Sequence, residues 1–282
     1  MRILITGAGG MVGAALAAHC RGLGDEVFAH ERASLDITRG PDVREVFARE
    51  RPDSVINCAA WTDVDACERD EARARLVNAE AVGVLAAASR AAGASFVTIS
   101  TDYVFRGDKG DFYTQRDDPD PQSAYGRAKL AGERLAQSST ARSTVVRTGW
   151  VYGPGGRNFL ARVVELARAG TPLKAIRDAF GTPTYAPDLA RRLRELAALD
   201  LPGVYHVTNA GDGTSFEGFA REALRLAGCD DSRLESVSMD SLDRPAPRPR
   251  DSRLRCLLSP AVGLPALPDW RDALREYVGG GA

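Results

Sequence analysis

The sequence predicts an α/β fold, in which a doubly wound parallel sheet carries helices on both faces and is followed by a smaller mixed α/β lobe. Short apolar runs of strand length alternate with longer segments of helical periodicity through the first 150 residues, which is typical of such a sheet. The runs are apolar throughout, as parallel strands buried on both faces should be. After residue 150 the elements become shorter and the loops rich in glycine and proline, which indicates the second unit.

The strands of the predicted sheet are short apolar runs, and the segments of helical spacing between them predict its covering helices. We expect strands at residues 3–6, 26–29, 54–57, 96–100 and 144–147, and helices at 12–23, 42–49, 76–92 and 125–136. Later in the chain we expect a strand at 204–207 and helices at 158–169, 188–199, 215–227 and 269–277. Thr214 or Ser215 is a suitable N-cap for the helix 215–227.

These elements suggest two units that the chain enters more than once. Residues 1–150, together with about 186–202, are expected to form a dinucleotide-binding domain. Residues from about 151–185 and 203–265 are expected to form a substrate-binding lobe.

The composition excludes several classes of protein. The 282 residues carry 37 basic and 38 acidic side chains, so bulk charge favours neither a nucleic-acid nor a membrane partner. The five cysteines are scattered and lack a C-x-x-C pair, which argues against a disulfide framework or a structural zinc site. No apolar run reaches the roughly 18–20 residues that span a bilayer, and no secretory signal is visible. We expect a cytoplasmic protein with reduced thiols.

The first motif is the glycine cluster after the first predicted strand, where Gly7, Gly10 and Gly13 are spaced as G-x-x-G-x-x-G. So tight a turn needs a residue that tolerates positive φ, and backbone N–H groups approach a diphosphate closely only where no Cβ intervenes. The N-terminus of the following helix favours the same anion. The position between a strand and a helix therefore predicts a Rossmann-type dinucleotide site.

The end of the second predicted strand bears on the choice between NAD and NADP. An acidic residue there would bind the ribose diol, and an arginine would accept a 2′-phosphate. The sequence offers His30, Glu31 and Arg32, so both cofactors stay open, as does the reading that all three are solvated loop residues.

The second motif pairs Tyr125 with Lys129, one turn apart on a predicted helix. A nearby lysine favours the phenolate and lowers the pKa of tyrosine from its ordinary value near 10. Such a phenol can donate a proton to a carbonyl that is being reduced. Tyr-x-x-x-Lys is common by chance, but Lys129 is one of only three lysines in the chain.

The third motif is the segment 100–105, Ser-Thr-Asp-Tyr-Val-Phe, at the end of a buried strand. Ligands of open parallel sheets bind just beyond the carboxyl ends of the strands. Thr101 is therefore expected to share a substrate oxygen with Tyr125 through a hydrogen bond.

The three motifs together resemble those of the extended short-chain dehydrogenases/reductases, and within that group the dTDP-4-dehydrorhamnose reductase family. The closer resemblance rests on residues 57–65, 100–105, 147–153, 180–184 and 250–254, and it runs in order from Met1 to the C-terminal helix. It implies reduction by NADPH, or NADH, of the 4-keto group of a dTDP-4-keto-6-deoxyhexose. The reaction that the resemblance favours is the reduction of dTDP-4-dehydro-L-rhamnose to dTDP-L-rhamnose.

By position, the resemblance implies contacts with the cofactor, contacts with the substrate, and a catalytic trio. Cofactor contacts are implied for Gly7, Gly10, Met11, Val12, Gly13, Asp36, Ile37, Ala60, Trp61, Thr62, Tyr125 and Lys129, to which we add His30 and Arg32. Substrate contacts are implied for Val64, Thr101, Asp102, Tyr103, Tyr125 and Trp150. In the trio, Tyr125 protonates the forming alkoxide, Lys129 lowers the pKa of Tyr125 and holds the ribose, and Thr101 orients the carbonyl. The implied chemistry requires no metal.

The nucleotide diphosphate is expected to lie against the lobe. Arginine suits a bidentate phosphate contact, and the candidates are Arg157, Arg177, Arg248 and Arg250. In an arginine-rich chain, ordinary surface charge explains each of them equally well.

Three departures from the family pattern leave the cofactor preference and the sugar open. Trp61 stands where the family often has histidine, Gly149 where it often has serine, and His30 where some members carry an acid. A related dehydratase would carry glutamate where Tyr103 stands, and the same segment disfavours an epimerase. The chain also resembles the non-catalytic regulatory beta subunit of methionine adenosyltransferase, against which the intact trio argues. A monomer and a homodimer both fit the sequence.

Overall fold

Six parallel strands form the central sheet of this computed structural model, which describes residues 1–280. The spatial order is β2–β1–β3–β4–β5–β10, which reverses direction at β1 as in doubly wound dinucleotide-binding sheets. The strands are β1 (Arg2–Thr6), β2 (Glu26–His30), β3 (Ser54–Asn57), β4 (Ser95–Thr101), β5 (Ser143–Thr148) and β10 (Gly203–His206). The predicted fold class is confirmed, and each predicted strand is present.

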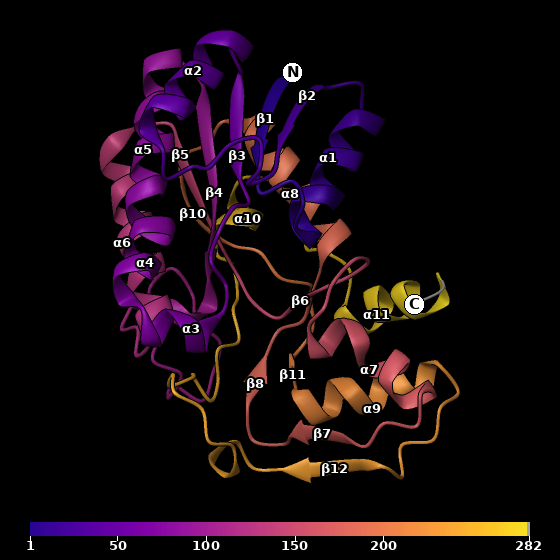
Figure 1. Cartoon of the computed structure of the whole chain (residues 1–282). Coiled ribbons are helices and arrows are strands. Elements are labelled where there is room, and N and C mark those ends of the chain that lie inside the picture. The colour runs from indigo at the N-terminus through magenta and orange to yellow at the C-terminus, as the bar shows by residue number, and fades with distance from the viewer. Residues whose placement is uncertain (281–282) are drawn as a thin grey trace.

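Helices cover both faces of this sheet (Figure 1). On one face, α1 (Met11–Gly22) packs against α8 (Ala186–Leu199), and on the other α5 (Ala81–Ala92) packs between α2 (Gly40–Glu50) and α6 (Ala124–Ser139). Alternate residues of β1 pack on opposite faces of the sheet. Ile3 and Ile5 belong to the core with α1 and α8, and Leu4 belongs to the core with α2 and α5. This double burial explains why the strands are apolar throughout.

The lobe is built from small strand pairs and three helices around an aromatic core. Tyr152, Tyr185, Phe219 and Trp270 pack together there. The helices are α7 (Phe159–Arg168), α9 (Phe216–Leu226) and α11 (Trp270–Gly279). The strand pairs are β7 (Leu173–Ile176) with β12 (Leu234–Val237), β8 (Phe180–Gly181) with β11 (Thr214–Ser215), and β6 (Val151–Tyr152) with β9 (Thr184–Tyr185). The expected helix cap is confirmed, because the Ser215 side chain accepts a hydrogen bond from the N–H of Gly218.

Two features differ from the sequence prediction. Residues 203–206, expected in the lobe, form β10 and pair with β5 at the edge of the large sheet. The region before α5 was expected to become helical only at residue 76. It instead contains α3 (Val64–Arg69), α4 (Glu71–Arg75) and a wider helical turn at Leu76–Glu80. Asp63 and Asp70 start α3 and α4, since each side chain accepts a hydrogen bond from a free N–H of the first turn.

Residues 250–255, which we call the return segment, connect the lobe to the large domain. On the lobe side, Phe180 N–H donates to the carbonyl of Arg250 over 2.6 Å, and Ser252 N–H donates to the carbonyl of Phe180 over 2.9 Å. On the large-domain side, Tyr113 N–H donates to the carbonyl of Arg253 over 2.7 Å. The segment therefore has backbone bonds to both units.

The five cysteines are free thiols. No helix within residues 1–280 combines the length and the apolar character that crossing a bilayer requires.

Candidate active site

A cavity of about 490 Å³ lies where the carboxyl ends of the sheet strands meet the lobe. The register of the sheet brings these ends together, since Thr6 pairs with Asn57 and Thr101 with Thr148. Most of the predicted site residues line this one cavity, although they are far apart in the sequence. They are Gly7, Gly10, Met11, Val12, Gly13, Ala60, Thr62, Val64, Thr101, Asp102, Tyr103, Tyr125, Lys129 and Trp150.

The glycine cluster forms a backbone cradle at one end of the cavity. Gly7 has a φ of 69°, and a Cβ placed there would lie 2.6 Å from the backbone nitrogen of Ala59. A Cβ on Gly13 would lie 2.3 Å from the carbonyl oxygen of Gly7. Helix α1 begins directly after Gly10, so its free N–H groups face this turn. The cradle fits the diphosphate of a dinucleotide, because backbone donors are accessible where side chains would block them.

A second cavity of about 400 Å³ continues from the cradle and shares Gly7, Gly10 and Ala60 with the first. Of the predicted cofactor contacts that do not line the first cavity, all but one line the second: Arg32, Asp36, Ile37 and Trp61. Two residues that the cofactor assignments did not include, Glu31 and Arg73, also line it.

His30 is the exception. It does not line either cavity; its Nε2 lies 2.9 Å from Glu50 Oε2, and its Nδ1 lies 3.2 Å from Ser34 Oγ. The expectation of a cofactor contact is therefore corrected: the side chain is buried between β2 and α2, and after β2 the chain first lines the cavity at Glu31 and Arg32.

Arg73 lies beside Trp61 on the wall of this second cavity. Its guanidinium carbon lies 4.4 Å from the centre of the Trp61 ring, and it forms no ion pair with any residue in the described part of the chain. Arg73 belongs to α4, whose start at Asp70 aims it at Trp61. The sequence missed it because neither α4 nor its capping was predicted.

We expect Arg73→Ala to raise the KM for NADPH by about tenfold and the KM for NADH by less, with kcat almost unchanged. A guanidinium forms charge-assisted hydrogen bonds with a phosphate such as the 2′-phosphate, which NADPH has and NADH lacks. The loss of one such bond lowers affinity by about tenfold. Steady-state kinetics with both cofactors measure this. Arg75→Ala is the matched control, because Arg75 lies on the same helix and pairs with Glu80 outside the cavity. Equal KM changes in the two variants would contradict the assignment.

The predicted catalytic trio is assembled by two neighbouring elements. Tyr125 and Lys129 lie on α6, which begins at Ser123 through a hydrogen bond from Gly126 N–H to the Ser123 hydroxyl. Thr101 ends β4 and lines the same cavity as Tyr125. Lys129 Nζ donates to the carbonyl of Ile99 over 2.6 Å. All three side chains are buried at the wall of the cavity.

The pKa values of Tyr125 and Lys129 differ from those that the sequence analysis predicts. Burial raises the pKa of Tyr125 above its ordinary value, although the neighbouring Thr101 hydroxyl opposes this. Burial also lowers the pKa of Lys129 to about 8, against the opposing effect of Glu133. Lys129 is directed at Ile99, and it is not among the largest causes of the shift in the pKa of Tyr125. In this arrangement burial therefore outweighs the lowering of the tyrosine pKa that was expected from Lys129.

Asp102 is the most deeply buried acid at the site. Burial raises its pKa to about 6, although hydrogen bonds from Ser252 and Thr101 act in the opposite direction. A Cβ on Gly149 would lie 2.5 Å from Asp102 Cγ, so this carboxylate occupies the space that a side chain at position 149 would need. Glycine at this departure from the family pattern thus accommodates Asp102.

The lobe closes the other side of the site with aromatic rings. Trp150 stacks on Phe216 with ring centres 3.7 Å apart, and a third cavity of about 300 Å³ continues beyond them into the lobe. Tyr103, Trp150, Phe159 and Phe216 line both this cavity and the one at the trio. Trp150 has a φ of 51°, an unusual conformation for a bulky residue, which places its ring in the passage between the two cavities.

The arginines of this third cavity differ from those expected. Arg248 lines it but is paired with Asp65 of α3 at 2.8 Å, and Arg250 is paired with Asp178 at 2.9 Å. Arg157 and Arg177 do not line it. Two cations that the sequence did not single out for this role do so: Arg244 and Lys174. Arg244 forms no ion pair among residues 1–280, so its charge is available to an anion.

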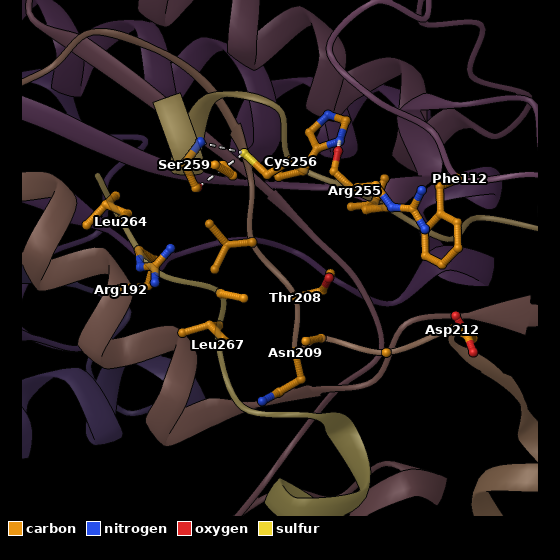
Figure 2. A pocket seen from close by; sticks show the side chains of 17 residues that line it. Phe112, Arg192, Thr208, Asn209, Asp212, Arg255, Cys256, Ser259, Leu264 and Leu267 are labelled. Atoms are coloured by element: carbon orange, nitrogen blue, oxygen red, sulfur yellow. Dashed lines mark hydrogen bonds between the residues drawn. The ribbon is translucent and has the colours of Figure 1, made fainter. Parts of the chain in front are cut away.

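A further cavity of about 380 Å³ lies outside this site, against the end of β10 (Figure 2). None of the predicted site residues lines it. Figure 2 shows Cys256 and Ser259 together on its wall, where the Ser259 hydroxyl donates to Cys256 Sγ over 3.2 Å. Asn209, also on the wall, donates to Asp188 and to the carbonyl of Pro268. The side chains of Cys256, Ser259 and Asn209 are thus engaged with one another or with the protein, while the buried Nε2 of His206 on the same wall has no hydrogen-bond partner among the described residues.

Known proteins resemble the chain over its whole length. The family model described as the RmlD substrate binding domain matches residues 1–280. A dTDP-4-dehydrorhamnose reductase of Streptomyces griseus is 42% identical over 98% of this chain and 92% of its own. A dTDP-4-keto-6-deoxy-D-glucose reductase of Streptomyces niveus is 38% identical over 98% of this chain and 96% of its own. The crystal structure of dTDP-4-dehydrorhamnose reductase from Bacillus anthracis in complex with NADP superimposes with a TM-score of 0.95, at 32% identity and 99% coverage of both chains.

Proposed function

Because this chain belongs to the RmlD family of dTDP-4-dehydrorhamnose reductases, we propose that its cavity between sheet and lobe is where the 4-keto group of a dTDP-4-keto-6-deoxyhexose is reduced. The chain is an NAD(P)H-dependent oxidoreductase. The proposal for the site rests on one observation: the glycine cradle, Thr101, Tyr125 and Lys129 line a single cavity.

The cofactor would be held by the cradle and by the second cavity. The diphosphate would lie on the backbone of Gly7, Gly10 and Gly13, and the adenosine between Ile37 and Trp61. When bound, the nicotinamide supplies the hydride for the reduction. Met11, Val12, Ala60 and Thr62 would line its path toward the trio.

The proton would come from Tyr125. Because burial keeps the pKa of this phenol high, its proton stays on the oxygen at neutral pH until charge develops on the substrate oxygen. Lys129 lies one turn further along α6, where its ammonium would stabilise the phenolate that remains and hold the ribose. The Thr101 hydroxyl, which lines the same cavity, would keep the phenol in place.

The substrate would extend from the trio into the lobe. The sugar would lie against Val64, Asp102 and Tyr103, and the nucleotide would pass Trp150 into the third cavity. Arg244 is the proposed diphosphate partner, in place of Arg157, Arg177 and Arg250. We propose dTDP-4-dehydro-L-rhamnose as the sugar and dTDP-L-rhamnose as the product.

The test follows NADPH and NADH absorbance with dTDP-4-dehydro-L-rhamnose generated in situ. Sugar-dependent oxidation supports the proposal and ranks the two cofactors. Oxidation only with another dTDP-4-keto-6-deoxyhexose would keep the reaction and change the sugar. Cofactor binding without oxidation across a panel of such sugars would refute the proposed reaction.

We also propose the two-unit division, with β10 now counted in the dinucleotide-binding domain, and a monomer or homodimer as the active form. Sedimentation equilibrium of the active enzyme distinguishes the last two.

A further inference from the structure

Outside the predicted trio, a buried serine is bonded to the acid that contacts Thr101. Ser252 Oγ donates to Asp102 Oδ2 over 2.5 Å, and Thr101 Oγ1 donates to Asp102 Oδ1 over 3.0 Å. Ser252 is 2% exposed and Asp102 is 3% exposed, so water does not compete for these bonds. A line of side-chain hydrogen bonds therefore runs from Ser252 through Asp102 to Thr101, which lines the same cavity as Tyr125.

We propose that Ser252 is a positioning residue for the reduction: its hydroxyl fixes the Asp102 carboxylate, which in turn fixes the Thr101 hydroxyl against Tyr125. This inference rests on the proposed function, because it assigns Ser252 a role in that same reaction. Ser252 acts through two intervening side chains and does not line the cavity at the trio.

The proton count at Thr101 shows what the line of contacts achieves. A threonine hydroxyl has one proton to donate and two lone pairs. The proton goes to Asp102, and one lone pair accepts the N–H of Tyr103 over 3.1 Å. With its proton and one lone pair engaged, the Thr101 hydroxyl is held in one orientation beside Tyr125, whereas the sequence suggested that it would share a hydrogen bond with the substrate oxygen.

This orientation depends on Asp102 being ionised and correctly turned. No basic side chain in the described residues pairs with Asp102; its carboxylate is held by the hydroxyls of Ser252 and Thr101. The titratable groups that face it are the phenols of Tyr103 and Tyr125. Ser252 supplies the only side-chain donor to Oδ2 in this part of the chain, so its loss frees that oxygen.

The location of Ser252 also connects this line of contacts to the lobe. Ser252 lies in the middle of the return segment, and its N–H donates to the carbonyl of Phe180 in β8. The same segment bonds to Tyr113 of the large domain. The relative placement of lobe and sheet therefore sets where the Ser252 hydroxyl lies.

The test is Ser252→Ala in the full-length enzyme. We expect kcat to fall by about 10- to 100-fold, the scale of a small displacement of a catalytic group, with the Kd for NADPH unchanged. The pH profile provides the specific readout. The bond from Ser252 lowers the pKa of Asp102, so its loss raises that pKa. Asp102 then takes up its proton at higher pH, and the acid limb of kcat should move upward by about one pH unit.

Two further variants control for a structural effect. Ser252→Thr retains a hydroxyl and should restore kcat and the acid limb toward wild type. Ser259→Ala removes another buried hydroxyl seven positions along the chain, one that contacts Cys256 at the separate cavity of Figure 2. It should change neither kcat nor the acid limb.

The following results would overturn the proposal. The proposal fails if the acid limb of the kcat profile is unchanged in Ser252→Ala. It also fails if kcat and NADPH affinity fall in parallel. Either result would indicate a purely structural role for Ser252. A wild-type enzyme that is inactive with every sugar tested refutes the proposed function instead. In that case, NMR titration of ¹³C-labelled aspartate decides, with Asp102 assigned through Asp102→Asn. The same Asp102 pKa in wild type and Ser252→Ala would show that Ser252 does not hold the carboxylate.

Discussion

Replacing Tyr125 by phenylalanine is expected to lower kcat by about 10²- to 10⁴-fold, the usual contribution of a general acid, while the affinity for NADPH changes little. The substitution removes only the hydroxyl that would protonate the alkoxide. The ring would keep its edge-to-face contact with Tyr103 and its packing against Cys67, Ala74 and Ala128. The fold of the cavity should therefore survive.

The measurement is sugar-dependent NADPH oxidation, with cofactor affinity determined separately by fluorescence titration. Tyr205→Phe is the control. Tyr205 lies on the edge strand β10 and is also buried, but its hydroxyl donates only to the carbonyl of Leu201. This variant should retain wild-type turnover. Near-normal turnover in Tyr125→Phe would remove Tyr125 from the acid role.

Replacing Arg147 by methionine is expected to reduce the free energy of unfolding by about 3–5 kcal/mol, the cost of leaving a buried charge unpaired. Arg147 binds Glu133 through two hydrogen bonds of 2.9 and 2.7 Å, and both side chains are almost fully buried between β5 and α6. Ser100 donates to the same carboxylate. Without Arg147, Glu133 would have to remain charged in the interior or take up a proton.

Urea unfolding monitored by circular dichroism measures this loss. Arg162→Met is the control, because its ion pair with Glu165 is exposed and should contribute less than about 1 kcal/mol. The double variant Glu133→Met/Arg147→Met should recover much of the stability, since no charge is then left unpaired. A single variant as stable as wild type would show that the pair does not contribute as its burial implies.

Local patterns predicted most of the fold, since the burial of each strand on both faces leaves a visible apolar run. They also located the glycine cradle and the pair Tyr125–Lys129, because a turn and a helix fix these geometries over a few residues. The structure brings these two motifs to one cavity. The sequence analysis missed α3 and α4, because both helices are too short to show a regular apolar pattern.

Contacts between distant side chains could not be predicted in this way. His30 was assigned to the cofactor because nothing local shows that Glu50 would pair with it. Arg248 was one of four candidates for a phosphate contact, but α3 brings Asp65 to it from the other unit. The bond between Ser252 and Asp102 joins residues 150 positions apart. The pKa of Tyr125 was misjudged for a related reason: burial outweighs the neighbouring lysine, and burial depends on the whole fold.

The place of α8 in the chain constrains how the nascent protein can fold on the ribosome. Strands β1 to β5 have all been synthesised by residue 148, but the cover that α8 adds beside α1 on one face of the sheet, through Leu189, Leu193 and Leu196, comes later in the chain. Residues 151–185, which include much of the lobe, emerge before that cover is available. The growing chain thus presents an incomplete apolar sheet while about forty further residues are added, a period in which aggregation competes with folding and chaperones bind. A polypeptide ending at residue 150 would remain in that exposed condition.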